Sequence, residues 1–101
     1  MQRVNISTGT PWEQVVGYSR AVRVGDHVYV SGTTASDEHG NVIGVGDVAA
    51  QSRYIFEKIE KALKSAGAAL TDVVRVRMFV TDISQWEAIG RVHGEIFGAI
   101  R

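Results

Sequence analysis

Hydrophobic and polar residues alternate in two short runs near the start of the chain, and Gly25-Asp26 separates the runs. A two-residue connection of this kind closes a tight β-hairpin, so we predict strands over about Arg20–Val24 and His27–Ser31. An earlier strand is expected at about Arg3–Ile6. The only proline, Pro11, lies between that strand and the hairpin.

The middle of the chain has a helical period. Asp47 can accept from the free N–H groups of a first turn, and Gly67 can take the left-handed position that ends a helix. The expected apolar face consists of Ile55, Ile59, Ala62, Leu63 and Ala66. Two charge pairs are spaced four residues apart on the exposed side, Glu57 with Lys61 and Glu60 with Lys64. This pattern predicts one amphipathic helix that covers an apolar surface.

A second alternating run, Val73–Val80, predicts another strand, which ends at Thr81-Asp82. One face carries Val74, Val76, Met78 and Val80, and the other carries Arg75, Arg77 and Phe79. The latter face is too mixed to be buried within one small monomer. The same face of neighbouring subunits could cover it, so we expect an oligomer.

A second helix is expected to begin at Ser84, because Ser84 and Glu87 have the spacing of a reciprocal capping box. Its apolar side would consist of Trp86, Ile89, His93, Ile96, Phe97 and Ile100. The predicted order is therefore strand, hairpin, helix, strand and helix. Both helices should pack on one face of a twisted sheet, which is an α+β architecture.

Composition narrows the class of protein. The 101 residues are expected to form a single domain, 1–101, and 45% of them are hydrophobic. Eleven basic residues balance eleven acidic ones, which disfavours nucleic acid and acidic lipid as partners. The chain has no cysteine, so thiol catalysis and thiolate metal sites are excluded. Met1–Thr10 lacks the apolar core of a secretory leader and no apolar stretch could span a bilayer, so a cytoplasmic location is expected.

Three histidines are candidates for chemistry. His39 lies in Ser36–Asn41, a stretch of turn formers and charges that predicts a surface loop, and His27 opens a strand beside a turn. His93 lies on the apolar side of the second helix. It could be an acid–base group, although a core or interface histidine is the simpler explanation. No spacing of His, Asp and Glu resembles a metal site, so no metal is expected.

Four arginines, Arg20, Arg23, Arg75 and Arg77, could form a patch for a carboxylate or phosphate if their strands lie side by side. Solvent-facing arginines paired with acidic residues are the simpler interpretation. Ser31 has no base nearby in the sequence and no nucleophile elbow. It is therefore a better candidate for a ligand contact than for a nucleophile.

Several segments in order resemble the RidA/YjgF/YER057c/UK114 family, from about Val16 to the end of the chain. The matching segments are Gly17-Tyr18-Ser19, Gly25-Asp26, Val28-Tyr29-Val30-Ser31-Gly32, Gly40-Asn41-Val42, Asp47-Val48-Ala49-Ala50-Gln51, Ala66-Gly67, Asp72-Val73-Val74 and Met78-Phe79-Val80-Thr81-Asp82-Ile83. No single motif is decisive, but their order identifies the chain as a member of the family.

The resemblance implies a chorismate-mutase-like fold, with a mixed β-sheet and two helices on one face. It implies a homotrimer with ligand clefts between subunits, and no metal or organic cofactor. For the best-known branch it implies hydrolysis of reactive enamines and imines such as 2-aminoacrylate to a 2-keto acid and ammonia. This chemistry needs a bound carboxylate, a positioned water and help with proton transfer.

Carried over by position, Tyr18 matches a pocket tyrosine of the family, although the proline that usually precedes it is absent. Ser31 and Gly32 match a strand end that contacts ligand through its backbone. Gly90 and His93 stand where the deaminase branch usually has Asn and Tyr. The expected ligand-binding residues are therefore Tyr18, Ser31, Gly32 and His93, and the catalytic residues are not assigned.

Members of the family continue with two further strands, which carry a carboxylate-binding arginine and a water-orienting glutamate. This chain stops at Arg101, slightly too early for Arg101 to be that arginine. A natural short variant, a truncated form and a fragment completed by strands from elsewhere all fit. Without the segment, the deaminase would be impaired or altered. The alternatives are a non-catalytic or regulatory small-molecule-binding oligomer and an RNA-cleaving translation inhibitor, and the charge balance does not favour the latter.

Overall fold

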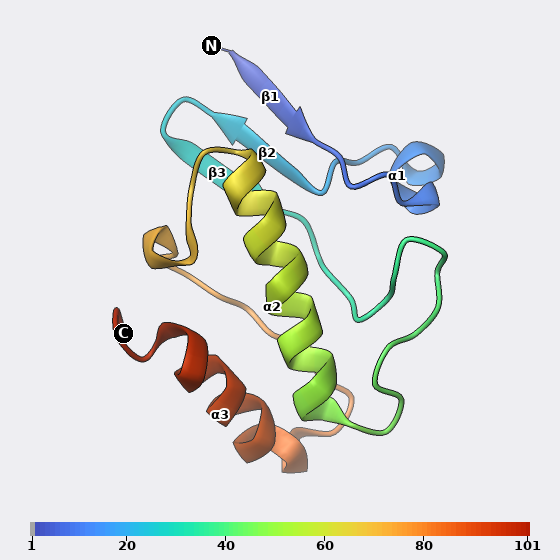
Figure 1. Cartoon of the computed structure of the whole chain (residues 1–101), viewed down its shortest axis with the longest axis vertical. Helices are drawn as coiled ribbons and strands as arrows, with labels where there is room; N and C mark the ends of the chain where they lie inside the picture. The colour runs from blue at the N-terminus through green and yellow to red at the C-terminus, as the bar shows by residue number, and fades with distance from the viewer. Residues whose placement is uncertain (1) are drawn as a thin grey trace.

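The computed structural model describes residues 2–101, and it is an α+β fold, as the sequence predicts. Its sheet has the strand order β1-β2-β3, with β1 at Arg3–Ile6, β2 at Ala21–Val24 and β3 at His27–Val30. The helices are α1 (Pro11–Val16), α2 (Val48–Ser65) and α3 (Trp86–Phe97), and the 3-10 turns are η1 (Leu70–Asp72) and η2 (Ile83–Gln85). The C-terminal end of α2 lies against the sheet, and α3 lies alongside α2 (Figure 1).

The predicted hairpin is confirmed. Its strands pair antiparallel from Ala21 with Val30 to Val24 with His27. Gly25 takes φ +60°, a conformation that suits a tight turn and favours glycine. Strand β1 pairs antiparallel with β2, so the described strands form an antiparallel sheet and not the expected mixed one. The reason is that the remaining predicted strand is unpaired.

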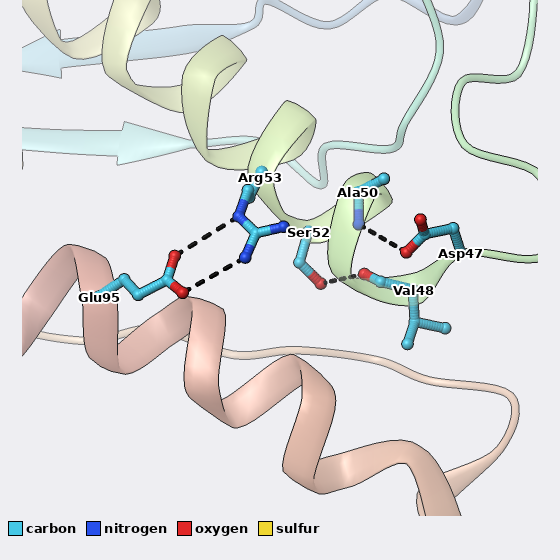
Figure 2. Close-up of polar contacts among 6 residues, drawn as sticks. All are labelled: Asp47, Val48, Ala50, Ser52, Arg53 and Glu95. Atoms are coloured by element: carbon cyan, nitrogen blue, oxygen red, sulfur yellow. Dashed lines mark hydrogen bonds and ion pairs between the residues drawn. The ribbon is translucent and has the colours of Figure 1, made fainter.

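Helix α2 begins and ends where the sequence predicts. The Asp47 carboxylate accepts from the Ala50 N–H at 3.0 Å (Figure 2), and Gly67 takes φ +81° just beyond the last turn. Of the two predicted charge pairs, Glu60 and Lys64 approach to 3.9 Å. The other predicted pair, Glu57 with Lys61, forms no ion pair among the described residues.

One side of α2 packs closely on the sheet. Ala62 and Ala66 form a buried cluster with Ala21 of β2 and Ile6 of β1, and Val28 and Val30 pack against it. Alanine side chains let the helix backbone approach the strands closely. The contact therefore depends on small residues.

The other side of α2 packs on α3 through a second buried cluster. The Phe56 and Phe97 rings meet edge to face, with centroids 5.3 Å apart and planes at 80°. Val92 completes this cluster and is only 1% exposed. On the surface, the Arg53 guanidinium meets the Glu95 carboxylate at 3.3 Å (Figure 2), an exposed pair that contributes little stability.

The start of α3 differs from the prediction. Ser84 lies inside turn η2, where its N–H and hydroxyl donate to the Asp82 carboxylate at 3.0 and 2.6 Å. Glu87 pairs with Arg91 at 2.6 Å, so the predicted Ser84–Glu87 capping box is wrong. The box is displaced because Asp82, two residues earlier, already caps this turn.

The predicted apolar side of α3 is correct only in part. Ile89 and Phe97 are buried, but Trp86 and Ile100 at the two ends are exposed. The most buried residue of the helix, Val92, is absent from the predicted face. The core therefore covers only the middle of α3.

The predicted strand at Val73–Val80 is wrong for the described residues, where this segment forms no strand and belongs to no sheet. Val73 and Val76, three residues apart, pack on the α2–α3 cluster, whereas Val74 is 98% exposed. Alternation alone does not make a strand, because a strand also needs a neighbour for its backbone N–H and C=O groups.

We expect Val92→Ala to lower the free energy of unfolding by about 2 kcal/mol, because it opens a cavity in the α2–α3 cluster. The matched change Val74→Ala should stay within about 0.5 kcal/mol of the parent. Urea denaturation of the three proteins would measure both values. Equal losses would contradict the described packing.

Candidate functional site

The segment that leaves the hairpin is fixed by its first residue. The Ser31 N–H donates to the Arg20 carbonyl at 3.1 Å, and the Ser31 hydroxyl donates to the Ser19 carbonyl at 2.6 Å. Because its proton is held by a carbonyl, this hydroxyl is better suited to accept a hydrogen bond than to attack a substrate. Gly32 is exposed, and its N–H forms no hydrogen bond within the described residues.

Tyr18 and Arg20, which precede strand β2, lie close to Ser31 and Gly32. Gly17 ends α1 in the left-handed region, at φ +83°, and directs the chain back towards the hairpin. The Arg20 guanidinium lies 5.4 Å from the centre of the Tyr18 ring and donates to the Gly32 carbonyl. Three predicted ligand-binding residues therefore lie together around Arg20, and we call Tyr18, Ser31 and Gly32 the wall.

The sequence predicts no helix at Pro11, only a stretch that separates two strands. Residues Pro11–Val16 form helix α1 there, and Thr10 and Glu13 fix its start. One Glu13 oxygen, Oε2, accepts from the hydroxyls of Thr10 at 2.8 Å and Thr8 at 3.0 Å, and more distantly from both backbone N–H groups. Proline at the first helical position and Glu three residues after Thr form a recognisable start signal. The sequence thus contains the signal for α1.

Glu13 is buried, with 6% of its surface exposed, and its second oxygen, Oε1, has no protein partner. Burial acts to raise the pKa of this carboxyl. The hydrogen bonds from Thr10, Ser7 and Thr8 together outweigh burial, so its pKa lies below the ordinary value of 4.5. Glu13 therefore holds the segment before the wall as a charged carboxylate.

A lysine from α2 holds the segment that follows the wall. Lys58 Nζ donates to the Thr34 carbonyl at 2.8 Å and to the Ser36 carbonyl at 2.7 Å. Burial lowers its pKa, and the nearby charge of Arg20 lowers it further. Sequence reasoning missed Lys58 because nothing local indicates that its ammonium group reaches across to residues 34–36.

The wall is open in a single copy of the chain. Two depressions in the surface lie around the hairpin turn, at the far end of the strands. One has a volume of about 430 Å³ and is lined by Val24, Gly25, Asp26, His27 and Tyr29. The other includes Gln2, Val4, Arg23 and Gly25. Neither contains a wall residue.

His93, the fourth predicted ligand-binding residue, lies in a different part of the molecule. Its ring is 4.8 Å from that of Phe97 and 6.1 Å from that of Phe56, in the α2–α3 cluster. Its surroundings therefore fit the packing interpretation. His27 and His39 are exposed, as expected.

The four arginines do not form the patch that was the less favoured interpretation of the sequence. Arg20 is 4% exposed and donates to Gly32. Arg23, at the other end of β2, donates to the Ala66 carbonyl at 2.6 Å. Arg75 and Arg77 are exposed on the unpaired segment, which does not lie beside β2 in the sheet. The patch fails because it requires adjacent strands.

Within residues 2–101, no group of three or more His, Asp and Glu side chains is placed to hold a metal ion. None of the described helices has both the length and the apolar character needed to cross a membrane.

Comparison with known proteins connects this arrangement to a family. A family model described as endoribonuclease L-PSP matches residues 9–101. The chain is 36% identical over 96 residues to the 3-aminoacrylate deaminase RutC of Acinetobacter baylyi, covering 95% of this chain and 75% of that protein. The chain belongs to the endoribonuclease L-PSP family.

Solved structures of the L-PSP family share this fold. The crystal structure of Rv2704 from Mycobacterium tuberculosis, a member of the YjgF/YER057c/UK114 family, superposes with a TM-score of 0.88 at 50% identity and covers 99% of this chain and 78% of that chain. The Escherichia coli YjgF gene product, at 24% identity, has a TM-score of 0.81 over 95% of this chain and 75% of that chain, which supports the fold alone. The resemblance found in the sequence is confirmed.

We expect the free energy of unfolding to fall as the pH is lowered from 4.5 through the pKa of Glu13 in the folded protein. The folded state has the lower pKa, so over this range the unfolded state binds more protons and acid favours it. Glu13→Gln should lack this part of the pH dependence and should be less stable by about 1–2 kcal/mol near neutral pH. Urea denaturation at a series of pH values would measure both effects.

The exposed change Glu87→Gln removes one negative charge without touching the Thr8–Glu13 contacts. It should keep the acid response of the parent. If E13Q keeps the response as well, Glu13 is not its source.

Proposed function

We propose that this protein is a RidA-type deaminase, which hydrolyses small carboxylated enamines or imines such as 2-aminoacrylate to a 2-keto acid and ammonia. The observation that carries the proposal is the grouping of Tyr18, Ser31 and Gly32 around one buried arginine. The similarity to RutC, a protein named for 3-aminoacrylate deamination, supports the same class of substrate.

The reaction requires few groups from the protein. A proton adds to the methylene carbon of 2-aminoacrylate and another leaves the nitrogen, which gives the imine. Water adds to the imine carbon, and the carbon–nitrogen bond then breaks to release ammonia and leave the keto acid. Positioning of the substrate carboxylate beside water is the principal task of the site.

The wall offers groups suited to that task. The free N–H of Gly32 can donate to a carboxylate oxygen, and the lone pairs of the Ser31 hydroxyl can accept from water or from the substrate nitrogen. The Tyr18 ring lies against the Arg20 guanidinium, which also donates to the Gly32 carbonyl. In this proposal the wall binds and orients the substrate, and the proton-transfer group is not assigned.

We also propose that the protein is a homotrimer, in which neighbouring copies close the open wall. The sheet face opposite α2 supports this assembly, because Tyr29 is exposed there and no described element covers it. Phe79, on the unpaired segment, is also exposed. Large apolar side chains left exposed are typical of subunit interfaces.

We expect the protein to accelerate the appearance of pyruvate and ammonia from 2-aminoacrylate generated during the assay. A Cβ at Gly32 would meet no protein atom within 4 Å, so Gly32→Ala should fold normally. Its methyl group would occupy the space of the ligand, and kcat/KM should fall at least about tenfold, or about 1.4 kcal/mol. Pyruvate formation would be followed with a coupled reductase.

Gly94→Ala, a similarly open position on α3, is the matched control and should keep full activity. Binding of pyruvate without turnover of 2-aminoacrylate would favour a non-catalytic binding protein. Cleavage of RNA without any effect on the imine would favour the activity in the name of the family. Either result would reject the deaminase.

We expect a solution mass three times that of the 11.0 kDa chain. Light scattering coupled to size-exclusion chromatography would measure it. Tyr29→Glu should lower the mass if the uncovered sheet face forms the interface, because burial of an unpaired carboxylate is costly. A monomeric parent protein would reject the trimer and the closure of the wall by neighbouring copies.

A further inference from the structure

The segment after β3 is held by cations at alternate residues. The carbonyls of Gly32, Thr34 and Ser36 each accept a hydrogen bond from a charged side chain, Arg20 for the first and Lys58 for the other two. The segment has backbone pairing only at its far end, where Ser36 bridges Val42 and the Ile43 N–H donates to the Ala35 carbonyl at 2.8 Å. The cations hold the carbonyls that precede and flank this bridge. Charged side chains thus hold three of the five consecutive carbonyls from 32 to 36, and a backbone N–H holds that of Ala35.

The two cations are close enough for the charge of Arg20 to contribute to the lowered pKa of Lys58. Like charges near one another in a partly buried region oppose folding, and the charges of Asp37 and Glu13, which act to raise the pKa of Lys58, offset part of this repulsion. Arg20 Nε is also buried without a partner, which adds a desolvation cost. An arrangement that costs stability in this way is typical of a functional site, where local rules of folding are broken.

The hydrogen bond from Arg20 to the Gly32 carbonyl acts on the peptide group that joins Gly32 to Thr33. The peptide between Gly32 and Thr33 is trans, so its N–H points away from its carbonyl and therefore away from Arg20. A cation that donates to the carbonyl polarises the whole peptide and strengthens its N–H as a donor. The Thr33 N–H forms no hydrogen bond within the described residues, so it is available to a ligand.

We propose that Arg20 is a positioning residue, which orients and polarises the Gly32–Thr33 peptide so that the Thr33 N–H donates to the carboxylate of the ligand. The same guanidinium supports the Tyr18 ring, and the Arg20 carbonyl accepts from Ser31. One buried residue thus contacts every member of the wall. The carboxylate ligand rests on the proposed function, whereas the effect on the peptide does not.

The test compares Arg20→Met with Arg23→Met. Arg20 lies just before β2 and Arg23 lies near its end, and each donates to a backbone carbonyl. Arg23 donates to the carbonyl of Ala66, which is away from the wall. In the ligand-free protein, R20M should move the amide resonance of Thr33 upfield, because its peptide is no longer polarised. R23M should leave that resonance in place. Two-dimensional amide NMR would measure both shifts.

Pyruvate, the expected product, is the probe for binding. R20M should raise the dissociation constant for pyruvate at least tenfold, and R23M should change this constant less than twofold. Arg20→Lys, which restores one donor and the charge, should recover part of the affinity and of the Thr33 shift. If R20M does not fold, the Thr33 shift and the pyruvate affinity are measured on R20K instead.

An unchanged Thr33 resonance in the Arg20 variants would overturn the proposal, and so would equal losses of pyruvate affinity in R20M and R23M. A parent protein that neither binds pyruvate nor deaminates would reject the proposed function instead. The ligand-free shift of Thr33 would still decide whether Arg20 polarises the peptide. The two failures are therefore distinguishable.

Discussion

Helix α2 contacts the sheet, α3 and the segment that follows the hairpin. Ala62 and Ala66 pack against the sheet, and Phe56 on another side of the helix packs against α3. Lys58 lies between them in sequence and reaches the segment after the hairpin. Since one helix serves both clusters and the loop, its position over the sheet determines the geometry of all three.

The wall, in contrast, depends on charged groups that are buried, as Glu13 and Arg20 are, or half-buried, as Lys58 is. Glu13 gathers the hydroxyls of Thr8 and Thr10 before the wall, and Arg20 and Lys58 hold the carbonyls within and after it. These groups replace the backbone pairing that a continuous sheet would provide. Charged groups are costly to bury, but their hydrogen bonds are stronger than neutral ones and fix irregular backbone well.

The elements with local signals could be predicted from the sequence. The hairpin follows from Gly25-Asp26 between alternating runs, and α2 follows from Asp47, Gly67 and its apolar period. Helix α1 also has such a signal in Thr10, Pro11 and Glu13.

The errors in the sheet, in the face of α3 and in the wall come from interactions between residues far apart in sequence, whereas the wrong start of α3 is a local error at Asp82. The segment 73–80 alternates as a strand does, but its state depends on whether another strand lies beside it. The face of α3 could not be placed without its partner, so Val92 was missed. The wall residues came from the family resemblance, whereas the contact between Arg20 and Gly32 became visible only in the folded chain.

The alanine contact between α2 and the sheet has a consequence for the evolution of the site. Lys58 is one helical turn before Ala62, so any larger side chain at Ala62 or Ala21 would lift the helix and draw the ammonium group away from Thr34. Two buried core positions would then alter the shape of the wall. The thickness of the core is in this sense a dimension of the proposed binding site, and selection on that site would act on residues that do not line it.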